Sequence, residues 1–132
     1  MWSFASLELE IEYTEYTKVG PSSIESIDSL IIKPYSDFSV IINPGEDGVN
    51  NPVIGYRFYF STNENVTLTS PYVDKGLPDD DNKITLSYRD LGSPSRGSII
   101  RLGILTRSKE TGYDSELSFN NNNFVKINSL PS

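Results

Sequence analysis

The chain has 132 residues with eighteen acidic and eleven basic side chains, which give a net charge of -7 and a pI near 4.5. This length suits one domain with its own hydrophobic core, and the acidity argues against nucleic acid as a partner. Since the chain contains neither cysteine nor histidine, disulfides, zinc sites and the usual catalytic triads are excluded, and no cofactor is expected.

The first predicted element is an N-terminal arm. Residues 7–13 alternate strictly between apolar and acidic side chains, so a strand would place one apolar set on a single face, opposite three glutamates: Leu7, Leu9, Ile11 and Tyr13. A Gly-Pro pair and two serines in residues 18–23 are typical of a turn or linker. We therefore predict an arm and linker over residues 1–27, with the arm's apolar face binding a partner.

Two apolar runs at residues 38–44 and 54–61 are the most informative part of the sequence. Both are rich in β-branched and aromatic side chains and are separated by a loop containing Pro and Gly, which predicts neighbouring strands of one sandwich sheet. Alternation places Tyr56, Phe58 and Phe60 on one face, where we expect the core. Tyr59 lies on the opposite face beside Arg57 and is the better candidate for a contact surface.

The remaining strands are expected to be short. Segments 30–32, 68–73, 83–88, 99–106 and 113–118 have strand-like composition, and turn residues separate them. No window repeats with the helical period of 3.6 residues. The pattern predicts an all-β protein, an antiparallel β-sandwich over residues 28–118, followed by a polar C-terminal tail over residues 119–132. No stretch approaches the roughly 20 apolar residues of a membrane span or resembles a signal peptide, so no membrane partner is expected.

Charge is distributed unevenly along the chain. Residues 1–51 carry nine acidic and two basic side chains, whereas residues 52–132 carry nine of each. Between Lys83 and Lys109 the only acidic side chain is Asp90, which predicts a basic, partner-binding surface that includes Arg89, Arg101 and Arg107. The acidic arm would then lie against the basic sheet of its own chain, or add as a strand to another subunit.

Three other patterns could suggest a metal site, a glycosylation site or a catalytic pair, but each is explained without one. The acidic run at residues 79–82 offers oxygen ligands, but consecutive side chains cannot all face one calcium ion, so a solvated turn is expected. The glycosylation pattern at residues 65–67 is treated as a chance match. Acidic residues on turns and on one strand face offer no evident cleft for glycosidase chemistry, so the chain is expected not to be an enzyme.

Four segments match the strands of a known family: residues 38–44 as a second strand, 53–61 as a third, 85–91 before a turn and 100–106 as a sixth. In these segments residues 29–118 resemble a fibronectin type III domain, which is an immunoglobulin-like sandwich. The family's usual tryptophan is replaced by Ile42 or Asn43, and its usual tyrosine in the sixth strand by Ile100. An immunoglobulin-like sandwich of another topology is the alternative.

The resemblance implies a spacer or binding module rather than a catalyst. The expected function is a structural or interaction role in a larger assembly, with protein subunits, including copies of itself, as partners. In composition the chain resembles accessory domains of bacteriophage virions, in the tail, neck or capsid surface. The alternative is a module of a secreted bacterial surface protein, located outside the cell, whose exposed loops 43–52 and 108–112 bind a glycan or a host protein.

Overall fold

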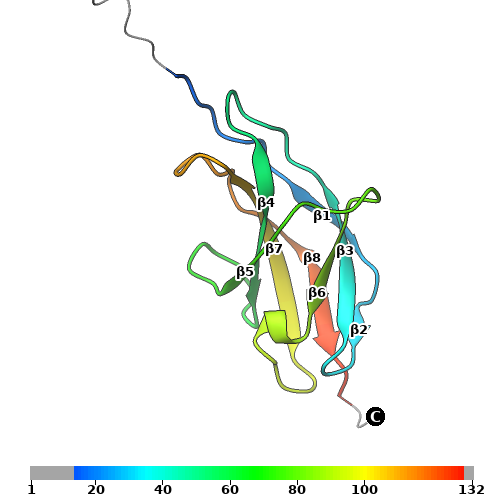
Figure 1. Ribbon diagram of the computed structural model, residues 1–132. Coiled ribbons are helices and arrows are strands. Elements are labelled where there is room, and N and C mark those ends of the chain that lie inside the picture. The colour runs from blue at the N-terminus through cyan, green and yellow to red at the C-terminus, as the bar shows by residue number, and fades with distance from the viewer. Residues whose placement is uncertain (1–13, 130–132) are drawn as a thin grey trace, which may run out of the picture.

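The computed structural model describes residues 14–129, which form two β-sheets around one core (Figure 1). The smaller sheet has the order β1-β3-β6 and is antiparallel throughout: β1 (Ser23–Ile27), β3 (Asp37–Asn43) and β6 (Lys83–Ser87). The larger sheet has the order β2-β8-β7-β4-β5: β2 (Ile31–Ile32), β8 (Ser118–Ile127), β7 (Ile99–Ser108), β4 (Val53–Ser61) and β5 (Tyr72–Lys75). Only β2, which runs parallel to β8, departs from antiparallel pairing. One 3₁₀ turn, η1 (Arg89–Leu91), completes the described elements. The prediction of an all-β protein is therefore confirmed.

The core consists of every second residue of the central strands. On β3 these are Phe38, Val40 and Ile42, and on β4 they are Tyr56 and Phe58, all of them buried. Alternate residues of β6, β7 and β8 complete the same cluster. The period of two in the sequence therefore identified the side of β3 and β4 that faces the core. Phe60, which was also expected in the core, is only partly buried and packs against the cluster.

The prediction that the first two apolar runs are neighbours in one sheet is wrong. β3 pairs with β1 and β6, whereas β4 pairs with β5 and β7. Residues 44–52 carry the chain from one sheet to the other, so the two strands face each other across the core. Alternation shows which face of a strand is buried, but it does not show which strand lies beside it.

Both predicted boundaries of the sandwich differ from the structure. β1 falls in the predicted arm and linker. It belongs to the sandwich instead, because Ile24 and Ile27 contribute to the core. β8, which except for its first residue falls in the predicted tail, also belongs to the sandwich, because Val125 and Ile127 are fully buried. The predicted strand at 113–118 is mostly a loop. The sandwich is therefore corrected to residues 23–127.

The edges of both sheets are short or irregular. At one edge of the larger sheet β2 has only two residues, and at the other β5 has four. In the smaller sheet the pairing of β1 shifts register between Ile24 and Ser26. The edge strand β6 has five residues and leads within two residues into η1.

The segment before β1 is fixed to one end of the sandwich (Figure 1). Val19 is buried; its N–H donates to the Tyr113 carbonyl at 3.1 Å, and the N–H of Gly20 donates to the Glu46 carbonyl at 2.8 Å. Asn51, which is 1% exposed, donates through Nδ2 to the Thr17 carbonyl at 2.9 Å. The predicted arm residues Leu7, Leu9, Ile11 and Tyr13 lie outside the described residues.

An ion pair connects the two sheets. It joins η1, which follows β6 of the smaller sheet along the chain, to β5 at the edge of the larger sheet. Asp90 Oδ2 lies 2.8 Å from Lys75 Nζ and accepts a hydrogen bond from the Ser87 N–H at 2.9 Å. Burial by itself would raise the pKa of Asp90, but the Lys75 ammonium and the Ser87 N–H outweigh it, so the pKa lies below its usual value.

We expect Asp90→Asn to lower the free energy of unfolding by about 1–2 kcal/mol at neutral pH, because one partner of this pair is lost. A lowered folded-state pKa stabilises the fold above the unfolded pKa near 4, and this contribution is lost as pH falls through the folded pKa. Urea unfolding at several pH values should therefore show the variant and the parent converging as the pH falls below the unfolded pKa and through the lowered pKa of the folded state. Asp80→Asn, in an exposed loop, is the control, and a pH-independent difference for Asp90→Asn would contradict the prediction.

Candidate binding surface on the five-stranded sheet

The outward face of the larger sheet carries an aromatic row. The strand registers place Phe119, Gly103, Tyr59 and Tyr72 side by side across β8, β7, β4 and β5. The rings of Tyr59 and Tyr72 are 5.5 Å apart between centroids. Tyr59, however, is only 4% exposed, because it packs with Val66 and Leu105 in a second small cluster. The prediction that Tyr59 offers an exposed contact is wrong.

Gly103 allows the loop at residues 62–70 to close over this face. A Cβ at this position would lie 3.0 Å from both Leu117 Cδ1 and Val66 Cγ1, which is closer than side chains normally approach. Because glycine leaves this space open, Val66 reaches the sheet and is buried. Its exposed neighbour Asn65 is thereby held beside the edge of the aromatic row.

Beside the aromatic row, the outward face of β4, β5 and β7 carries a network of charged side chains. Arg57 Nε donates to Asp74 Oδ1 at 2.7 Å and Nη2 donates to Oδ2 at 3.2 Å, while Arg107 Nε lies 3.6 Å from Asp74 Oδ1. The Arg57 guanidinium also lies over the Tyr72 ring, 4.1 Å from its centroid. The bond to Asp74 raises the pKa of Arg57 above its ordinary value, so the guanidinium stays charged.

The structure does not bring the three predicted basic residues together. Arg101 and Arg107 point to the same face of β7 but are six residues apart, about 20 Å along a strand. Arg107 contacts Asp74, while Arg101 Nη1 donates to the Asn63 carbonyl at 3.4 Å. Arg89 is exposed on η1, where it lines a hollow with Tyr35 and Tyr88.

The asparagine run forms a bulge in β8. Arg101 of β7 lies opposite Phe124, and Gly103 lies opposite Phe119, so residues 120–123 of β8 oppose the single residue Leu102. Asn120 Oδ1 accepts a hydrogen bond from the Asn122 N–H at 2.9 Å, an Asx-type turn that fixes the bulge. The amides of residues 120–122 are consequently exposed.

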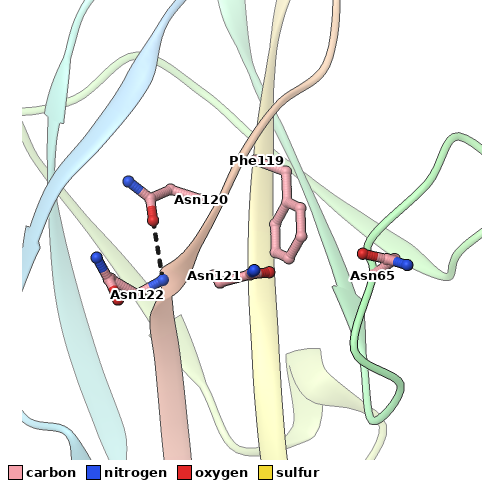
Figure 2. A pocket seen from close by; sticks show the side chains of 5 residues that line it. All are labelled: Asn65, Phe119, Asn120, Asn121 and Asn122. Atoms are coloured by element: carbon pink, nitrogen blue, oxygen red, sulfur yellow. Dashed lines mark hydrogen bonds between the residues drawn. The ribbon is translucent and has the colours of Figure 1, made fainter.

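A groove of about 590 Å³ lies between this bulge and the 62–70 loop, and we refer to it as the Asn groove. Its lining residues are Asn65, Phe119, Asn120, Asn121 and Asn122. Figure 2 shows the Phe119 ring and the Asn121 amide extending toward the side of Asn65, whereas Asn120 and Asn122 extend the other way. No lining side chain is charged.

Sequence reasoning did not find this groove. Asn65 belongs to a glycosylation pattern that is expected to be a chance match, and residues 120–123 fall in the predicted tail. The only available signal was four consecutive polar amides immediately before the strand-like pair Val125 and Ile127.

The described part of the chain has no group of three or more Asp or Glu side chains arranged to hold a metal ion. Nor does any helix within residues 14–129 have the length and apolar character to cross a membrane. Comparison of the chain with protein-family models, curated proteins and solved structures found no match.

Proposed function

We propose that this chain is a non-catalytic interaction module that docks through its N-terminal arm on another protein subunit of a larger assembly. The observation that carries the proposal is the fixed segment that immediately follows the arm. Residues 17–20 bond to the loops at one end of the sandwich, so the alternating residues 7–13 adjoin a point whose position the fold determines.

The arm has the composition needed for pairing with a foreign sheet. As a strand, its apolar face would enter the partner's core, and its backbone would supply the hydrogen bonds. Its glutamates favour a partner with a basic edge. On the chain's own larger sheet, Arg57 and Arg107 are already engaged with Asp74, which supports docking on another subunit over docking on its own sheet.

We further propose that the sandwich belongs to the fibronectin type III or immunoglobulin-like class. The strand order supports this, because consecutive strands β3 and β4 lie in opposite sheets, as do β6 and β7. Such crossing connections are typical of immunoglobulin-like sandwiches. The setting that we propose is a bacteriophage virion, on the basis of the small, acidic, cysteine-free domain. A secreted surface protein is the second candidate, favoured by the exposed polar groove on the larger sheet.

Removing residues 1–13 tests the docking role. The shortened chain should enter the assembly with which the full chain purifies at least about tenfold less well, a loss of about 1.4 kcal/mol. Its melting temperature should remain within about 2 °C of the parent value. The deletion must stop before residue 14, because Val19 is buried and Thr17 bonds to Asn51.

Point variants separate the apolar face of the arm from its charge. Leu9→Asp with Ile11→Asp should reproduce the deletion, whereas Glu8→Gln with Glu10→Gln should mainly slow association. Unchanged assembly of the chain that lacks residues 1–13 would overturn the proposal.

A further inference from the structure

We propose that the Asn groove binds a neutral saccharide. This inference goes beyond the proposed docking function and does not depend on it, because the groove is built entirely from described residues on the outward face of the larger sheet. The two walls of the groove are fixed in position, and its lining side chains are polar or aromatic and carry no charge.

The first wall, which carries Asn65, is held in place by its own loop. The neighbouring Val66 is buried over Gly103. The Thr67 N–H donates to Ser70 Oγ at 3.0 Å, and the Ser70 N–H donates to the Thr67 carbonyl at 3.0 Å. A site that is formed before the ligand arrives loses little conformational freedom on binding.

The second wall is the bulge of β8, which is also fixed. Its ends are paired with β7 at Phe119 and Phe124, and the Asn120 side chain closes a turn onto the Asn122 N–H. Because the bulge leaves the strand ladder, the Asn121 amide points into the groove beside the Phe119 ring (Figure 2). Phe119 is half-buried against the Tyr59 cluster, so the orientation of its ring is set by packing.

The lining chemistry matches a polyhydroxylated, uncharged ligand. The Asn65 and Asn121 side chains each offer two N–H donors and one carbonyl acceptor to the groove, and a sugar hydroxyl both donates and accepts. The Phe119 ring supplies an apolar surface for the C–H face of a pyranose. An anionic ligand would meet no cation in the lining and would approach a protein of net charge -7, so acidic saccharides and nucleic acids are disfavoured.

The experiment is an NMR titration of the full chain with neutral oligosaccharides of glucose, mannose, galactose and N-acetylglucosamine. Asparagine side-chain NH₂ groups give their own signals, so the site is observed directly. We expect at least one oligosaccharide to shift the side-chain signals of Asn65 and Asn121 saturably. We expect Asn65→Ala and Asn121→Ala each to weaken binding about fivefold, since one hydrogen bond contributes about a factor of five in affinity.

Asn123→Ala is the matched control, because Asn123 belongs to the same run but lines a hollow beside Ser23 and not the Asn groove. Its affinity should equal that of the parent, and the spectra report whether each variant is folded. The proposal is overturned if no neutral oligosaccharide causes saturable shifts, or if Asn123→Ala weakens binding as much as Asn121→Ala. Shifts confined to the loops 43–52 and 108–112, tighter binding of sialylated or sulphated analogues, or shifts of Asn121 caused by a peptide of residues 1–13 would also overturn it.

Discussion

Replacing Phe58 with alanine should lower the free energy of unfolding by about 3–5 kcal/mol. Phe58 is 0% exposed in the middle of β4, with Val73 of β5 and Ile104 of β7 as its cross-strand neighbours. Removing the ring would forfeit the apolar area it buries and would leave a cavity between the two sheets. For a domain whose total stability is about 5–15 kcal/mol, this loss is large.

Urea unfolding followed by circular dichroism measures the effect. The midpoint should fall while the dependence of free energy on denaturant stays the same, because the same surface is exposed on unfolding. Leu68→Ala is the control, since that side chain is 65% exposed and its loss should change stability by less than about 0.5 kcal/mol. A loss below about 1 kcal/mol for Phe58→Ala would contradict burial of this ring in a tightly packed core.

The second large effect is expected for Asn51→Leu, which should lower the free energy of unfolding by about 2–4 kcal/mol. The Asn51 side chain donates to the Thr17 carbonyl at 2.9 Å and accepts from the Glu110 N–H at 2.9 Å. Leucine has a similar size but leaves the half-buried Thr17 carbonyl and Glu110 N–H without this partner. Each unpartnered group should cost about 1–2 kcal/mol of stability. The substitution should also release the segment before β1, which Asn51 ties to the loop at residues 108–114.

Amide hydrogen exchange separates these two consequences. In the Asn51→Leu variant, exchange at Val19 and Gly20 should speed up more than exchange in the core of β7, because local opening precedes global unfolding. Asn43→Ala serves as the control, since its exposed amide donates only to Ser23 Oγ, and a change below about 1 kcal/mol is expected. Unaltered protection at Val19 would show that Asn51 does not hold the N-terminal segment.

The sequence identified burial far better than it identified partners. Alternation in β4 placed Tyr56, Phe58 and Phe60 on the core side, because a pleated strand has only two faces, and the first two are fully buried. The pairing of strands depends on long-range contacts that the local pattern does not encode, so β3 and β4 were placed in the wrong relation. β8 was missed because four asparagines interrupt its alternation, and the structure accommodates them as a bulge.

The candidate surface was harder to predict for the same reason. The Asn groove joins Asn65 to residues more than fifty positions away, and it depends on the absence of a side chain at Gly103. The basic surface was predicted from charges counted along the chain. That count could not anticipate that Asp74, on the edge strand β5, lies between Arg57 and Arg107.

The short and interrupted edge strands have a consequence for crowded solutions. Long, flat runs of unpaired backbone let sheets of separate molecules fuse into fibres. Here β2 has two residues, β5 has four, and a register shift interrupts β1, so the folded domain offers little template for indiscriminate growth. Many copies can therefore be packed at high local concentration without polymerising through their sandwiches.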